Sequence, residues 1–471
     1  MSTVEGREQV KDQGLREHPW SGLRLRVCEG GYRRTPLPLY REGGVRWGIV
    51  VGPEQPEGIA AKAIDGLDVE RWLVREGEVQ LKEDGAACVE WRKDGAVAGL
   101  VAGGVELVHA IDCHEGGGSI PTEVGVVIAR FVERLRQGGC SPIAVAVGPE
   151  VYMEVAKLRA IRMLAERVAL FLGRALRVRI WARTSLVSYS RIEPETNALR
   201  ATLSALASIF GGADFVGVAP YDVLAPGGPE VRSRALRLSA TTGLIADLEA
   251  HLALVDDPLF GAYAIEEWTE ALARKAWELV REIERMGGAS QAVEWVRKRV
   301  GSESVRFDEL ALRGRPLRIG ATAFARSDAP MLGPLLPIWS AVRRETAWIE
   351  ALREGQWVRP TGILRWGDPG LLHARLAFIE ERLRVLGIEP LIFEWDPARP
   401  LPEGADAFVI CTEDKRFAEL ASLRPFSVPV ALAGKAGALE GALRAVGIRA
   451  FLFQGCDLLA FARALYREGH S

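Results

Sequence analysis

The chain has 471 residues, of which 48% are apolar and 26% are charged, as in an ordinary globular protein of two or three domains. Its 60 basic and 62 acidic residues leave a formal net charge of −2, so no strong field directs it to nucleic acid or to a membrane surface. The N-terminus lacks the apolar core of a signal peptide, and no apolar run is long enough to span a membrane. Six cysteines without a CxxC pair favour reduced thiols over a disulfide framework or a zinc site, and together these features predict a cytoplasmic protein.

The first predicted segment, residues 1–40, is polar and irregular, and we expect an N-terminal arm that lies across a partner protein. Over residues 41–325 short apolar runs alternate with amphipathic stretches. We predict strands at 47–51, 71–74, 105–111, 143–147, 178–182, 215–219 and 317–321, and helices at 57–64, 121–137, 150–172, 196–210, 231–254 and 265–286. Strand–helix alternation over this length predicts a parallel sheet closed into a (β/α)8 TIM-type barrel. Residues 76–104 are too short for two helices, so we expect the first half of the barrel to be trimmed.

Residues 326–368 carry Pro, Trp and charge without clean alternation, which indicates a linker. A second α/β pattern fills residues 369–471. We predict strands at 390–393, 407–411, 428–433 and 450–453 and helices at 372–386, 416–423, 438–446 and 457–467. This pattern is typical of a small doubly wound sheet of the flavodoxin-like kind.

Two polar groups follow predicted barrel strands, where barrel active sites form. Asp112, His114 and Glu115 are one group, and their residue types suit acid–base chemistry or a metal site. The alternative is a polar turn without a ligand. The other group is Asp222 with three arginines of the next helix, for which a solvated helix face is the favoured interpretation; these arginines are Arg232, Arg234 and Arg237.

Four stretches of the sequence share their residue order with one enzyme family. They are the helix-forming segment 256–288 (DDPLFGAYAIEEWTEALARKAWELVREIERMGG), 154–168 (EVAKLRAIRMLAERV), 181–218 (from WARTSLVSYS to GGADFVGV) and parts of 404–466. In this order the chain resembles the methylmalonyl-CoA mutase family, which rearranges acyl-CoA thioesters with adenosylcobalamin. The resemblance implies a barrel followed by a degenerate cobalamin-binding-type domain.

Three departures from the family pattern bear on activity. Trp181 stands where the resemblance implies an imidazole that approaches the thioester carbonyl. His373 lies in a helical stretch and lacks the Asp-x-His-x-x-Gly context of the family's cobalt ligand. The segment from Tyr32 to Tyr40 has two tyrosines without the family's spacing. We therefore expect no catalytic residue, no metal ligand and no cofactor-binding residue in this chain.

The resemblance then implies the small, non-catalytic subunit of a two-chain mutase. Its partner would be the catalytic large subunit in a heterodimer, which would hold adenosylcobalamin and would bring acyl-CoA to the complex. Arg183, Ser185 and His114 are the residues left that would contact substrate. One alternative is a divergent mutase subunit that has its own active site, with Arg183 or His114 as substitute donor, and that relies on a separate cobalamin-binding chain. Another is a non-enzymatic protein that binds acyl-CoA or a chaperone.

Overall fold

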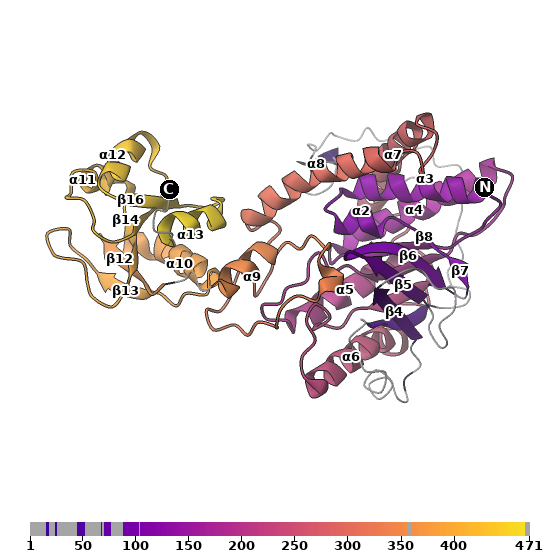
Figure 1. Cartoon of the computed structure of the whole chain (residues 1–471), viewed down its shortest axis with the longest axis horizontal. Coiled ribbons are helices and arrows are strands. Elements are labelled where there is room, and N and C mark those ends of the chain that lie inside the picture. Colours follow the sequence, from indigo (N-terminus) through magenta and orange to yellow (C-terminus); the bar gives the residue numbers. More distant parts are fainter. Residues whose placement is uncertain are drawn as a thin grey trace, which may run out of the picture. The chain divides into compact units, whose positions relative to one another are not determined.

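The computed structural model describes residues 16–17, 24–25, 45–51, 67, 70–76, 88–102, 104–355 and 359–466. Most of the predicted arm at 1–40 and the predicted helix at 57–64 lie outside these residues. The arm contributes two short strands, β1 (Arg16–Glu17) and β2 (Arg24–Leu25), which pair antiparallel. The chain divides into two compact units (Figure 1). The first comprises Met1–Tyr189, Asn197–Val305 and Leu332–Arg344, and the second comprises Ser190–Thr196, Arg306–Met331 and Glu345–Ser471.

The first unit contains one large sheet. Its strand order is β7 (Val105–Glu106), β6 (Ala96–Ala102), β5 (Cys88–Lys93), β4 (Glu70–Glu76), β3 (Arg46–Val51), β11 (Phe215–Val218), β10 (Ile180–Thr184), β9 (Ile143–Val147) and β8 (Val108–His109). Only Leu107 separates β7 from β8, so the two ends of this order belong to one continuous stretch of chain. The sheet therefore returns to itself, as a barrel requires.

One strand of this sheet runs against the others. β6 pairs antiparallel with both β5 and β7, whereas the other neighbouring strands pair in parallel. The β5–β6 hairpin turns at Asp94 and Gly95, which both have positive φ values of 50° and 77°. The sequence prediction missed this hairpin, although Asp-Gly between alternating apolar residues is a strong hairpin signal. This reversed strand lies within residues 76–104, the stretch in which we expected the first half of the barrel to be trimmed.

The described part of the first unit also contains helices, most of which come after a strand in the sequence. They are α2 (Ile111–Glu115), α3 (Ile120–Arg136), α4 (Val151–Phe171), α5 (Thr196–Phe210), α6 (Pro229–Leu244), α7 (Tyr263–Arg285) and α8 (Val293–Leu312), with α8 continuing into the second unit. The predictions for α3, α4, α5 and α7 are confirmed to within two residues at each end. The predicted helix 231–254 was too long, because α6 gives way to a π-helical turn at Ile245–Glu249. The prediction of a strand at 317–321 was wrong: Ile319 forms only an isolated bridge with Ala323.

The second unit is built on a five-stranded, fully parallel sheet (Figure 1). Its order is β13 (Leu391–Glu394), β12 (Thr361–Trp366), β14 (Ala407–Thr412), β15 (Val430–Ala433) and β16 (Ile448–Leu452). Its helices are α9 (Ala347–Glu354), α10 (Pro369–Val385), α11 (Phe417–Leu420), α12 (Glu440–Ala445) and α13 (Leu458–Tyr466). Numbered along the chain, the strands run 2-1-3-4-5, an order found in doubly wound sheets. The interior strand β12, next to the edge strand β13, was missed, because its residues fall in the range predicted as a linker. The prediction of a mixed α/β protein with parallel sheets is confirmed.

Candidate functional site

The carboxyl end of the closed sheet holds a buried cluster of four charged side chains. Glu90 and Arg92 lie two residues apart on β5, so both point to the same side of the strand. Arg183 comes from β10 and Glu115 from the end of α2. None of the four is more than 2% exposed. Two acids and two bases make the cluster neutral, which is the condition under which charges are tolerated in a protein interior.

The four side chains are joined by direct hydrogen bonds. Arg183 donates through Nε to Glu90 Oε2 at 2.7 Å and through Nη2 to Glu115 Oε1 at 2.6 Å. Arg92 donates through Nη2 to Glu90 Oε1 at 2.7 Å and to Glu115 Oε1 at 2.8 Å, and through Nη1 to the carbonyl of Gly95 at 2.7 Å. The donors of both arginines are thus directed at protein acceptors.

These contacts set the charge states of the cluster. Burial by itself would raise the pKa of Glu90, but the Arg183 and Arg92 guanidinium groups outweigh it and lower that pKa to about 2. Burial would lower the pKa of Arg183, and the Glu90 and Glu115 carboxylates more than reverse this and raise it. Glu90 and Arg183 therefore both remain charged at neutral pH. Arg183 serves as the cation that pairs with the buried carboxylates.

A tryptophan closes the cluster from the segment 332–344. Trp339, in the short 3-10 turn Pro337–Trp339, is fully buried, and the Arg92 guanidinium lies 4.6 Å from its ring centroid. Its Nε1–H donates to the carbonyl of Val223 at 2.9 Å. The same segment is tied down on either side, because Leu336 N donates to Leu224 O at 3.0 Å and Arg343 N donates to Glu115 O at 2.8 Å. The Trp339 ring therefore covers the paired charges.

A second polar network lies beside the first. His114 contacts Ser185 Oγ through Nε2 at 2.7 Å and Glu123 Oε2 through Nδ1 at 3.0 Å. Lys157 contacts Glu123 at 3.2 Å and Glu154 at 2.6 Å, and donates to the carbonyl of Ala146 at 2.7 Å. Burial by itself would raise the pKa of Glu123, but Lys157 and His114 outweigh it, so the pKa of Glu123 lies below its usual value. The structure thus brings the three predicted residues together: His114 contacts Ser185 directly, and Arg183 contacts Glu115, the neighbour of His114. Their prediction as substrate contacts stays a prediction.

Trp181 occupies the interior of the same sheet. It stacks on Phe215 with ring centroids 4.4 Å apart and an interplanar angle of 19°, and the Arg46 guanidinium lies 5.4 Å from its ring. The side chain is 7% exposed. Aromatic packing therefore fills the position at which the resemblance implies an imidazole.

The second predicted polar group is divided by burial. Arg232 is buried and paired with the fully buried Asp222, whereas Arg234 and Arg237 are exposed on α6. The interpretation of all three arginines as a solvated face was therefore wrong for Arg232. Asp112 pairs with Arg130 at 2.7 Å. Within the described part of the chain, no group of three or more His, Cys, Asp or Glu side chains could hold a metal ion.

The residues of the second unit do not fit a corrinoid with a histidine below its cobalt. In a doubly wound sheet ligands bind where the strand order reverses, here between the carboxyl ends of β12 and β14. Thr412 Oγ1 bridges these ends by donating to Trp366 O at 2.7 Å, and Arg375 reaches across to Thr412 O and Asp414. Trp366 packs edge-on against Trp395 at 6.2 Å. His373 is exposed on α10, past the first helical turn.

Sequence reasoning missed Glu90, Arg92 and Trp339. A signal for the first two was present, because two charges at alternating positions in the strand sequence CVEWRK face the same side as Cys88 and need a buried partner. Trp339 carried no local signal, since its position over the sheet depends on the path of the segment 332–344.

Comparisons with known proteins place this architecture in a family. Residues 122–355 match the family model described as methylmalonyl-CoA mutase. The chain is 33% identical over 398 residues to the methylmalonyl-CoA mutase small subunit of Streptomyces virginiae, a match covering 75% of this chain and 62% of that protein. It is 34% identical over 257 residues to a probable small subunit of Mycobacterium bovis, covering 51% and 42%, and 26% identical over 235 residues to the small subunit of Porphyromonas gingivalis, covering 46% and 38%. These matches span roughly 40–60% of the relatives' own lengths.

The large sheet with its filled carboxyl end and the parallel five-stranded sheet define a mixed α/β protein, consistent with the family that the comparisons find. The chain belongs to the methylmalonyl-CoA mutase family, as the sequence resemblance predicted, and relatives in that family carry the name small subunit. Among the residues that the structure describes, no helix is long and apolar enough to cross a membrane.

Proposed function

We propose that the chain is the small subunit of an adenosylcobalamin-dependent methylmalonyl-CoA mutase, that it is not catalytic itself, and that it stabilises a catalytic large subunit in a cytoplasmic heterodimer. In this proposal the first unit is a trimmed (β/α)8 barrel, and the second is a degenerate cobalamin-type domain of the flavodoxin-like kind. Acyl-CoA and adenosylcobalamin are bound by the large subunit, and this chain binds neither cofactor nor metal.

One observation carries the proposal: the paired charges and Trp339 fill the end of the barrel where chemistry takes place in this architecture. A mutase needs a donor free to stabilise charge on the acyl oxygen. Arg183 is held by Glu90 and Glu115, and His114 contacts Glu123 and Ser185 through its two ring nitrogens. Both substitute donors required by the alternative of an independent active site are therefore already engaged.

The loss of cofactor binding is supported by the second unit. The crevice between β12 and β14 is bridged by Thr412 and Arg375, and Trp366 at its edge is packed by Trp395 and by the Arg416 guanidinium at 4.7 Å. No imidazole stands in the first turn of α10.

Co-expression with a methylmalonyl-CoA mutase large subunit tests the proposal. Size-exclusion chromatography is expected to show a complex of one copy of each chain. Mutase activity with added adenosylcobalamin is expected from the complex and to be absent from this chain alone.

Two results would contradict the proposal. Turnover by this chain alone with adenosylcobalamin would show its own active site. A base-off, histidine-ligated corrinoid spectrum of the purified chain would show that the second unit still binds the cofactor. A variant with His373→Ala is the control for that spectrum, since His373 is the described histidine nearest the cofactor crevice in sequence.

A further inference from the structure

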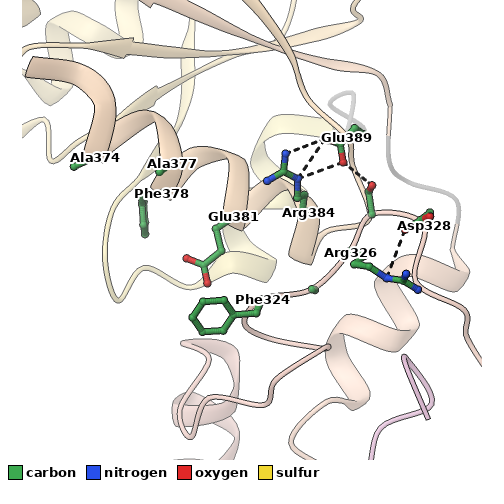
Figure 2. Close-up of a pocket in the computed structure, with 11 residues that line it drawn as sticks. Phe324, Arg326, Asp328, Ala374, Ala377, Phe378, Glu381, Arg384 and Glu389 are labelled. Atoms are coloured by element: carbon green, nitrogen blue, oxygen red, sulfur yellow. Dashed lines mark hydrogen bonds and ion pairs between the residues drawn. The ribbon is translucent and has the colours of Figure 1, made fainter. Parts of the chain in front are cut away.

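A groove of about 790 Å³ lies on the second unit, between the segment 324–328 and α10 (Figure 2). Its apolar surface comes from Phe324, Ala325 and the small side chains Ala374 and Ala377, with Phe378 beside them. Ser327, two arginines and three acids complete the lining; the acids are Asp328, Glu381 and Glu389. The groove thus combines an apolar surface with a net negative rim.

Phe324 combines an unfavourable backbone conformation with an exposed aromatic side chain. Its backbone has φ +49°, a left-handed conformation that bulky side chains rarely adopt. Its ring is 71% exposed, although Ala323 and Ala325 on either side are buried. Residues that keep such strain in native structures cluster at binding sites, where an external contact uses them.

The turn before Phe324 fixes this orientation. Gly320 N donates to Ala323 O at 2.9 Å, Thr322 N donates to Arg318 O at 2.8 Å, and Arg318 N donates to Thr322 Oγ1 at 2.9 Å. Arg318 is in turn paired with the buried Glu345. Because the turn is closed on itself and anchored, Phe324 cannot relax by folding its ring inward without breaking these bonds.

The charges of the groove are unevenly compensated. Arg384 is bonded to Glu389 at 3.0 Å, and Arg326 is bonded to Glu193 at 2.9 Å, so both arginines are already neutralised. Asp328 is 82% exposed and reaches Arg326 only at 3.8 Å. The Glu381 carboxylate points toward the ring of Phe324 in Figure 2 and has Arg382 as a neighbour at 3.2 Å. An aromatic face beside partly uncompensated carboxylates suits a cationic side chain, through cation–π attraction and charge-assisted hydrogen bonds.

We propose that this groove is a docking site for a segment of the large subunit that inserts an arginine or lysine between Phe324 and Glu381. This inference rests on the function proposed above, because it takes the large subunit as the partner. The ring of Phe324 would cover the cation, the Glu381 and Asp328 carboxylates would pair with it, and Ala374 and Ala377 would leave room for the neighbouring chain.

The test measures the dissociation constant of the complex between the full chain and the large subunit. Glu381→Lys and Phe324→Gly are each expected to weaken it at least about tenfold. Glu403→Lys and Leu371→Ala alter exposed residues of the same unit outside the groove, and both are expected to leave the dissociation constant within about twofold. Phe324→Gly is also expected to raise the Tm of the isolated chain, because glycine adopts positive φ without strain. A fold defect would lower the Tm, so the Tm separates the two causes of weaker binding.

Each other outcome overturns the docking site. A wild-type complex whose affinity is unchanged by Glu381→Lys and Phe324→Gly rejects the groove and leaves the proposed function standing. Unchanged affinity together with expansion of the isolated Glu381→Lys chain in small-angle scattering assigns the groove to this chain's own first unit. The absence of any wild-type complex rejects the proposed function and the docking site together.

Discussion

Arg183 on β10 and Glu115 at the end of α2 lie 68 positions apart in sequence, yet Arg183 Nη2 and Glu115 Oε1 are 2.6 Å apart in a site that excludes solvent. α2 follows β8, which lies two strands from β10, whereas Glu90, the other carboxylate bonded to Arg183, lies on β5, four strands from β10 in the sheet order. Because neighbouring strands lie about 4.8 Å apart, Arg183 reaches Glu90 only when the sheet closes. Arg183 is therefore a reporter of closure as well as the centre of the buried charge cluster.

Replacing Arg183 with methionine is expected to destabilise the chain by about 3–5 kcal/mol, because Glu90 and Glu115 would be left buried with a single cation between them. Equilibrium unfolding in urea measures this change. Arg274→Met is the matched control, since Arg274 makes an exposed pair with Glu270 on α7. We expect the control to change stability by less than about 1 kcal/mol. A loss of similar size in both variants would contradict a structural role for the cluster.

Trp339→Ala is expected to cost about 3–5 kcal/mol, because a fully buried ring that covers Arg92 would be replaced by a cavity. Trp339→Phe keeps an aromatic ring and removes the hydrogen bond to Val223 O, so a smaller loss is expected. Thermal unfolding of the two variants beside the wild type measures both effects. Equal Tm values for wild type and Trp339→Ala would show that burial of the ring over Arg92 does not stabilise the chain.

The stability of the chain is expected to fall as the pH drops from about 6.5 to about 4, because of His109. Burial lowers the pKa of His109 to about 4, and the nearby Asp112 opposes this only in part. The unfolded chain has a histidine pKa of about 6.5, so in this interval it binds a proton that the folded chain does not. The contribution is thus complete above about pH 6.5 and is lost as the pH falls toward 4.

The difference between wild type and His109→Gln isolates this effect from the carboxylates that titrate at lower pH. The free energy of unfolding of the variant is expected to depend less on pH between 6.5 and 4. Parallel curves for the two proteins over this interval would rule out a neutral, mostly buried His109.

Gly125→Ala tests the close packing of α3 on α7. A Cβ at Gly125 would lie 2.3 Å from Leu279 Cδ2 and 3.1 Å from Ala276 O, so we expect a loss of about 1–3 kcal/mol from overpacking. Gly301→Ala is the control on α8, where nothing lies within 4 Å of the added atom. There the better helix propensity of alanine is expected to stabilise the chain by up to about 1 kcal/mol. Urea unfolding should therefore move the two midpoints in opposite directions, and a stabilised Gly125→Ala would contradict the packing.

The elements predicted correctly from sequence are those in which apolar residues repeat at a regular spacing over many residues. The helix α5 was predicted at its observed bounds, because Ala201, Ala205 and Ile209 recur every four residues between Thr196 and Gly211, and all three are buried. β6 was missed because the Gly and charge around it were taken for a loop, although Asp94-Gly95 marks the hairpin. β12 was missed because Trp and Pro residues nearby hid a short buried strand. The spacing of apolar residues reveals which face of a single element is buried. The burial of β6 and β12 depends instead on the elements that pack around them.

The candidate site divides in the same way. His114 and Ser185 follow strands in sequence, so their approach at one end of the sheet could be expected from topology. The pairing of Arg183 with Glu90 could not, since Glu90 lies on β5, in the stretch 76–104 for which no strand was predicted. The position of Trp339 could not be expected either, since it depends on the path of the segment 332–344, whose only regular element is the short 3-10 turn Pro337–Trp339.

That reversed strand also limits what substitution can achieve. In a complete barrel each strand is followed by a loop at the carboxyl end, and these loops supply the reacting groups. Here the chain turns at Asp94-Gly95 and goes straight back, and a Cβ at Gly95 would fall 2.3 Å from Ser340 Oγ, so the turn is pressed against the segment that carries the tryptophan. A substitution that introduced an imidazole or an unpaired guanidinium at this end would supply a functional group but would not move this turn away from the segment 332–344. To open this end of the sheet, the backbone between β5 and β6 would have to be lengthened by an insertion as well as altered in its side chains.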